Sequence, residues 1–205
     1  MAGLREKQKE GRHRRILEAA RQKFRSSNYR DVTVEAIAED AELSAMTVFN
    51  YYGSKGGLLL SLVTESDRHL IEKIDNVLDD DHPTASAAIL AYSQTIFDHA
   101  FSYLDQQTWG HVLSTSIREG NSTFGRGFMA LEDELRGLLA KLLDRLRMRG
   151  LVVSDCDCET AATVIYNVHN ARFIEFASDP GILRSEIDQR TNKDLQFVAK
   201  TISRS

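Results

Sequence analysis

Residues 32–58, VTVEAIAEDAELSAMTVFNYYGSKGGL, contain the pattern that decides the fold. Thr33 and Ser44 each precede a short amphipathic stretch, and a hydroxyl at such a position accepts a hydrogen bond from the free N–H groups that begin a helix. The spacing predicts two short helices, one after Thr33 and one from Ser44 to Gly53. The segment 41–43 forms the turn between them, and Gly53 ends the second helix, as glycine commonly does.

Two short helices joined by about four residues are typical of a helix-turn-helix, which places its second helix in the major groove of DNA. The first residues of that helix are small and uncharged, so the backbone can approach the DNA closely. Met46 or the methyl group of Thr47 can contact a thymine methyl, and the Thr47 hydroxyl can bond base or phosphate. Tyr51, one turn further on, and Lys55 are placed to reach phosphates. We interpret this segment as a DNA-binding unit.

The segment before this unit is strongly basic. Residues 1–30 carry ten lysines or arginines and three carboxylates, whereas the whole chain has a net charge of −4. A basic end on an acidic body favours a polyanionic partner, although a solvated basic tail would have the same composition. We expect residues 1–11 to be a flexible arm and a helix over 12–25, where Ile16, Ala20 and Phe24 form an apolar stripe.

The rest of the chain predicts an all-α fold. Only two prolines interrupt it, and the apolar periodicity is helical. The expected helices cover about 55–78, 84–104, 108–118, 124–149, 157–178 and 184–203. This gives a three-helix DNA-binding domain over 1–57 and a larger helical domain over 58–205.

The same composition bears on the cellular location. No apolar run reaches the length that a membrane helix needs, and the N-terminus is not a secretory signal. Cys156 and Cys158 are one residue apart, which fits a reduced cytoplasm better than a disulfide framework. We therefore expect a cytoplasmic protein with no membrane partner.

The segment 32–58, together with ILEAARQKF at residues 16–24, resembles the DNA-binding domain of the TetR family of repressors. Three positions depart from that pattern: Glu42 stands where the turn usually has glycine, Phe49 replaces a tyrosine, and Gly56 replaces an acidic residue. A residue other than glycine at 42 has a backbone cost if its φ is positive. The resemblance, with the helix positions above, implies DNA contacts at Thr33, Ser44, Ala45, Met46, Thr47, Phe49, Asn50, Tyr51 and Lys55. Core positions are expected at Phe24, Ile37, Val48 and Tyr52, and Phe49 is expected to be partly buried.

The resemblance also implies that the larger domain binds a small-molecule effector and forms a homodimer through its last two helices. The apolar positions expected at that interface are Ala161, Val164, Ile165, Val168 and Ile174 on one helix and Ile187, Leu195, Val198 and Ile202 on the other. The same stripes would also suit a core within one chain. The implied function is a repressor of a palindromic operator that the effector releases.

An effector pocket should combine aromatic rings with a few polar groups. The candidates are Phe97, Phe101, Tyr103, Trp109, His111, Phe128, Tyr166, His169, Asn170 and Phe173. His169 and Asn170 are the best pair for hydrogen bonding to a ligand, although a buried histidine satisfied by the protein is an equal interpretation.

Other functions have less support in the sequence. Cys156 and Cys158 would supply two soft metal ligands, but no histidine follows closely, so we predict no metal and no cofactor. No phosphate loop, nucleophile elbow or zinc-protease motif is present, which argues against an enzyme. The alternative kept open is a regulator or activator that needs no ligand and is controlled by a partner protein.

Overall fold

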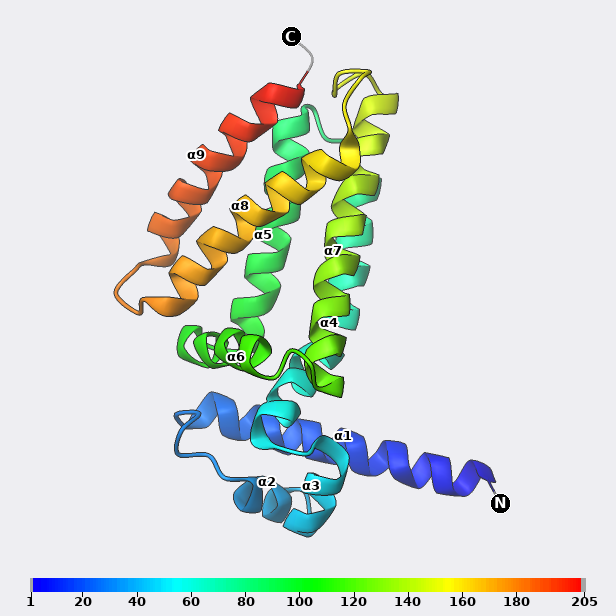
Figure 1. The fold of residues 1–205 in the computed structure, drawn as a ribbon, viewed down its shortest axis with the longest axis vertical. Helices are drawn as coiled ribbons and strands as arrows, with labels where there is room; N and C mark the ends of the chain where they lie inside the picture. Colours follow the sequence, from blue (N-terminus) through cyan, green and yellow to red (C-terminus); the bar gives the residue numbers. More distant parts are fainter. Residues whose placement is uncertain (1, 204–205) are drawn as a thin grey trace. The chain divides into compact units, whose positions relative to one another are not determined.

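The computed structural model describes residues 2–203, and these residues form nine α-helices (Figure 1). The helices are α1 (Ala2–Ser26), α2 (Val34–Asp40), α3 (Ala45–Tyr52), α4 (Lys55–Asp79), α5 (Ala85–Tyr103), α6 (Gln106–Arg118), α7 (Thr123–Met148), α8 (Cys158–Ser178) and α9 (Arg184–Ile202). The all-α prediction is confirmed. Met1 and residues 204–205, which the predicted domains include, lie outside the described residues.

The capping residues act as the sequence predicts. Thr33 Oγ1 accepts a hydrogen bond from the N–H of Ala36, and Ser44 Oγ accepts one from the N–H of Thr47. Gly53 follows α3 with a φ of 73°. These local signals set the ends of α2 and α3 because they satisfy backbone groups that a helix end leaves unpaired.

The N-terminus differs from its prediction. The expected flexible arm over 1–11 is wrong for the described residues, because α1 begins at Ala2 and continues without a break to Ser26. The apolar stripe that predicts a helix covers only the second half of α1. Residues 6–10 are polar and exposed, so sequence periodicity could not detect this part of the helix.

The chain divides into two compact units, one of Met1–Ser66 with Gln107–Met129 and the other of Asp67–Gln106 with Ala130–Ser205. The predicted boundary near residue 58 is therefore not the boundary of these units, since the first unit also includes most of α6. The division falls within α4, within α7 and after Gln106, the first residue of α6, so these three helices contribute to both units.

The core of the first unit fixes α2 and α3 against α1. Ile16, Phe24, Ile37 and Val48 are all at most 1% exposed. Tyr52 is also buried, and its hydroxyl lies 2.7 Å from Nδ1 of His13 on α1. The four expected core positions, Phe24, Ile37, Val48 and Tyr52, are confirmed.

The core of the second unit is built from α4, α5, α7, α8 and α9. Tyr92 on α5 is buried and donates a hydrogen bond to the carbonyl of Leu135 on α7 at 2.5 Å. Figure 1 shows α8 and α9 side by side, joined by a short turn. Ion pairs join their facing sides: Arg172 on α8 binds Asp194 on α9, and Arg190 on α9 binds Glu175 on α8.

Hydropathy gives no membrane-spanning candidate among the described helices.

Candidate functional site

The α3 helix has two distinct faces. Val48 and Tyr52 point into the first unit and are at most 2% exposed. Met46 is 68% exposed and Phe49 is 41% exposed, and Asn50 is exposed beside them. Positions 46, 49 and 50 are three and four residues apart, so they share one side of the helix. This outward face is the surface that α3 can present to a partner.

The turn before α3 is held in a left-handed conformation without a glycine. Glu42 has a φ of 55°, which costs a residue with a Cβ atom about 1–2 kcal/mol. The carboxylate of Glu42 forms an exposed ion pair with Arg15 of α1 at 3.4 Å. Such a pair stabilises the fold little. The departure from glycine therefore leaves strain in the turn.

The hydroxyl groups expected at the DNA surface have partners within the protein. Thr33 caps α2 and is exposed. Oγ of Ser44 and Oγ1 of Thr47 lie 2.8 Å apart, and both belong to the N-cap of α3. Ala45 lies between them and is half-buried. The structure thus brings these four predicted residues to the start of α2 and of α3.

Tyr51 and Lys55 also contact the protein. The Tyr51 hydroxyl accepts a hydrogen bond from Nε of Arg12 on α1 at 3.1 Å. The ammonium of Lys55 donates to the carbonyls of Tyr29 and Val32 at 2.7 and 2.8 Å. Partial burial lowers the pKa of Lys55. An ammonium has three N–H donors, so a phosphate contact by Lys55 would use the third.

The start of α4 is crowded at two glycines, and at Gly57 the neighbour is backbone. Ser54 Oγ accepts from the N–H of Gly57 at 2.8 Å and also donates to Glu119 at 3.3 Å. A Cβ atom on Gly57 would meet the carbonyl oxygen of Tyr52 and lie 2.9 Å from the Phe124 ring. A Cβ on Gly56 would lie 2.7 Å from Oε1 of Glu119.

Three of the predicted effector residues, Phe97, Phe101 and Phe173, belong to an aromatic cluster in the second unit. Phe101 on α5 and Phe173 on α8 have ring centroids 5.0 Å apart. Phe97 and Phe176 complete the cluster, with centroids 5.4 Å from Phe173 and 4.7 Å from Phe101 respectively. The interior of the second unit therefore has a strongly aromatic side.

A polar group of side chains adjoins that cluster. His169 is 2% exposed, lies edge-on to Phe97, and its Nδ1 is 2.8 Å from Oγ of Ser93. Burial lowers the pKa of His169 to about 3, so its ring is neutral at physiological pH. Tyr166 and Asn170 donate to Oε2 of Glu132 at 3.2 and 3.1 Å. Burial raises the pKa of Glu132.

Sequence analysis missed Glu132 and Ser93. Each lies on a helix whose pattern marks polar residues as outward, and only the packing of α5, α7 and α8 shows that they point inward. Tyr166, His169 and Asn170, which the sequence selected, lie beside them. The structure therefore brings these three predicted residues together with two that were not predicted.

The remaining effector candidates lie elsewhere. Trp109, His111 and Phe128 belong to the first unit, where the ring of His111 stacks on Tyr29 at 4.5 Å. Tyr103 stacks on His99, whose Nε2 lies 3.7 Å from the buried carboxylate of Asp67. Burial and the charge of Glu132 raise the pKa of Asp67 to about 8. The effector candidates selected from the sequence thus belong to both units.

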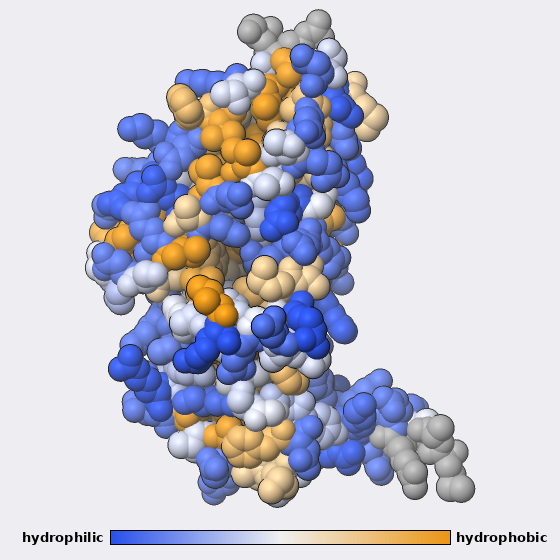
Figure 2. Space-filling model, in the orientation of Figure 1, coloured by the Kyte–Doolittle hydropathy of each residue, from blue (hydrophilic) through white to orange (hydrophobic). Residues whose placement is uncertain are grey.

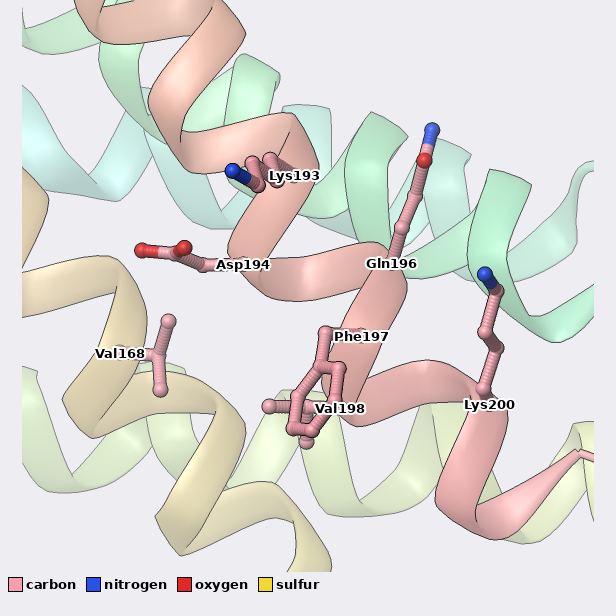
Figure 3. Close-up of a pocket in the computed structure, with 7 residues that line it drawn as sticks. All are labelled: Val168, Lys193, Asp194, Gln196, Phe197, Val198 and Lys200. Atoms are coloured by element: carbon pink, nitrogen blue, oxygen red, sulfur yellow. The ribbon is translucent and has the colours of Figure 1, made fainter.

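The outward face of α8 and α9 exposes several apolar side chains. Figure 2 shows apolar side chains gathered over these helices, and Val164, Ile174 and Phe197 are 46%, 50% and 73% exposed. A groove of about 580 Å³ lies on this face (Figure 3). Its apolar lining is Val168 of α8 with Phe197 and Val198 of α9, and its polar lining is Lys193, Asp194, Gln196 and Lys200. Such a face is unusual on a surface that stays in water.

The expected interface positions divide into three groups by burial. Ile165, Ile187 and Leu195 are at most 2% exposed, which fits the alternative of a core within one chain. Half-buried positions are Ala161, Val168, Val198 and Ile202. Val164 and Ile174 do point outward. Phe197 was not selected, because the apolar stripe of α9 runs through its inward side.

The cysteines are placed as structural residues. Cys156 and Cys158 are both buried and reduced. Burial raises the pKa of Cys158 to about 12, which suppresses the thiolate that a metal or an oxidant would need. Within residues 2–203, no three His, Cys, Asp or Glu side chains are grouped to hold a metal ion.

Part of the chain matches one known family, and its fold matches several solved structures. Residues 16–62 match the family described as bacterial regulatory proteins, tetR family. Curated proteins gave no match. Among solved structures, FadR of Bacillus subtilis in complex with stearoyl-CoA is 18% identical, covers 92% of this chain and 98% of its own, and gives a TM-score of 0.70.

Two further structures share the fold. A TetR-family regulator from Pectobacterium atrosepticum is 16% identical over 94% of both chains, with a TM-score of 0.71. The ketosteroid regulator KstR2 of Mycobacterium tuberculosis is 16% identical over 95% of this chain and 96% of its own, with a TM-score of 0.58.

Proposed function

We propose that the chain is a DNA-binding transcriptional regulator of the TetR family, and that it is a repressor that binds a palindromic operator as a homodimer and leaves it when a small molecule binds the second unit. The observation that carries the proposal is the outward face of α3. Its exposed Met46, Phe49 and Asn50 follow a capped helix start, and an α-helix of this kind fits the major groove. A regulator of this kind acts where the DNA is, so a cytoplasmic location belongs to the proposal.

The nine residues proposed to contact DNA have two different roles. Met46, Phe49 and Asn50 face the bases, and the remaining residues position the helix. The exposed basic side chains of α1, including Lys7, Lys9 and Arg14, add attraction to phosphate that does not depend on sequence.

A homodimer is supported by the apolar face of α8 and α9. Val164, Ile174 and Phe197 would leave water if a second copy packed there as a four-helix bundle. A single α3 contacts too few base pairs for high specificity, and two copies reading an inverted repeat double the contacts.

Effector binding is supported by the interior of the second unit. Phe97, Phe101 and Phe173 provide apolar area, and His169 and Glu132 provide polar groups of defined geometry. Two structures of similar fold are FadR in complex with stearoyl-CoA, which carries a long apolar acyl chain, and a ketosteroid regulator. A coupling of about 1–3 kcal/mol between the two sites would reduce operator affinity about 5- to 150-fold.

The test of DNA binding is selection from random duplex DNA by the purified protein at about 150 mM salt, where non-specific binding is weak. We expect an inverted repeat to be enriched. A folded protein that enriches no sequence contradicts the proposal.

The test of effector control uses the selected operator. A library of apolar molecules is screened for release, and Glu132→Gln and Asn170→Ala are compared with the unmodified protein. We expect both variants to shift the effector concentration for half-release while operator affinity without effector stays constant. If no molecule releases the protein and a partner protein does, the alternative of a ligand-independent regulator replaces the effector proposal.

A further inference from the structure

The outward face of α3 has a particular chemistry. Met46 and Phe49 expose apolar side chains, and Asn50 exposes an amide beside them. The hydroxyl of Thr47 is already 2.8 Å from Ser44 Oγ within the helix cap. The groups offered to a partner are therefore a thioether, a phenyl ring and one amide.

The same segment lacks the groups that recognise guanine. From Glu42 to Ser54 the sequence has no lysine or arginine, the side chains that most often bond O6 and N7 of guanine in the major groove. Asn50 is the residue type that bonds N6 and N7 of adenine. The thymine opposite an adenine carries a 5-methyl group, which apolar side chains can contact.

We propose that α3 recognises A·T base pairs, with Met46 and Phe49 packed on thymine methyl groups and Asn50 bonded to an adenine. The inference rests on the proposed operator binding and adds which bases each half-site contains. Basic residues on α1 supply attraction to phosphate, so affinity does not require a cation on α3. Specificity at these positions comes from methyl groups, which a single chemical change can remove.

The experiment replaces each thymine of a selected half-site by deoxyuridine, one position at a time. This removes the methyl group and leaves every hydrogen-bonding group of the base pair in place. Binding is measured by fluorescence anisotropy at constant salt. At the contacted thymines we expect affinity to fall about fourfold, which corresponds to about 0.8 kcal/mol for one buried methyl group.

Protein variants then assign the contacts. In Met46→Ala, binding to the thymine operator weakens, and one deoxyuridine position no longer has any effect. Met148→Ala is the matched control, because Met148 is 78% exposed on α7 and should change neither value. In Asn50→Ala, the preference for adenine at one position falls about tenfold.

The outcomes separate this inference from the proposed function. An enriched inverted repeat whose deoxyuridine substitutions all bind like thymine overturns the methyl contacts and leaves operator binding intact. An enriched half-site of G·C pairs at the α3 positions also overturns them. Failure to enrich any sequence contradicts the operator proposal itself.

Discussion

The ammonium nitrogen of Lys55 lies 2.7 Å from the carbonyl oxygen of Tyr29 and 4.3 Å from the centroid of the same residue's ring. One cation thus joins the start of α4 to the segment between α1 and α2. The ring of Tyr29 in turn stacks on His111 of α6. Lys55 therefore has a structural role in the first unit in addition to its proposed contact with phosphate.

Lys55→Met removes the ammonium and keeps the apolar stem. We expect the free energy of unfolding to fall by about 2 kcal/mol, because two hydrogen bonds from a charged donor are lost. Urea denaturation measures the change. On the same protein, the proposed phosphate contact predicts that the slope of log affinity against log salt falls by about one unit. Lys55→Arg is the control that keeps the charge. An unchanged slope would remove Lys55 from the DNA contacts.

Glu42→Gly should stabilise the protein. Glycine adopts a φ of 55° without a Cβ clash, which we expect to raise the free energy of unfolding by about 1 kcal/mol. Glu42→Ala removes the same carboxylate and keeps the backbone strain, so it should give no gain. Equal stabilisation by both variants would assign the effect to charge instead of backbone conformation.

Gly57→Ala should destabilise the first unit by about 1–3 kcal/mol, because the added Cβ meets the Tyr52 carbonyl and the Phe124 ring. Gly137→Ala is the matched control within a helix. A Cβ there meets nothing within 4 Å, and alanine should stabilise α7 by roughly 0.5–1 kcal/mol. Thermal denaturation followed by circular dichroism compares the two variants. A Gly57→Ala variant as stable as the unmodified protein would show that position 57 is not close to the Tyr52 carbonyl in solution.

Phe197→Glu should convert the proposed dimer into monomers. The interface loses the apolar area of the phenyl ring, and a buried carboxylate loses hydration that pairing with Lys193 or Lys200 would only partly replace. Sedimentation velocity at micromolar concentration measures the mass. Ile117→Glu introduces the same charge at a side chain that is 86% exposed on α6 and should leave the mass unchanged. A dimer that persists in Phe197→Glu would place the interface elsewhere.

His169 should make stability depend on pH. Its pKa is about 3 in the folded protein and about 6.5 when unfolded, so the unfolded state binds the proton more tightly. The stabilisation is complete above pH 6.5 and is lost as pH falls. From pH 7 to pH 5 the loss is about 2 kcal/mol. His169→Asn, which cannot titrate, should lose less over this range, as urea denaturation at each pH will show. Equal losses would contradict a buried neutral ring.

The sequence predicted the helices well because their ends carry local signals. Thr33, Ser44 and Gly53 act on neighbouring backbone groups, so no knowledge of the tertiary structure was needed to place α2 and α3. Sequence analysis expected a backbone cost at Glu42 if its φ were positive, and the φ of 55° meets that condition. The first half of α1 has no apolar stripe and no cap signal, and it was missed.

The candidate sites were less accessible to sequence reasoning. The inward position of Glu132 depends on how α7 packs against α8, and the exposure of Phe197 depends on which side of α9 faces the core. Both depend on how each helix is rotated about its own axis. A short stripe of apolar residues does not define that rotation well. The assignment of the nine DNA contacts stays a prediction.

The helical N-terminus changes what DNA binding requires of the chain. A flexible basic segment would lose conformational entropy on meeting a phosphate backbone, and that loss would reduce its net contribution to affinity. In α1 this ordering is already complete before any DNA is present. Its 25 residues extend about 38 Å at 1.5 Å per residue, close to one turn of the double helix at about 34 Å. The basic side chains of α1 are therefore held on a preformed helix. Less conformational entropy is lost when they contact phosphates, so each contact contributes more to the free energy of binding.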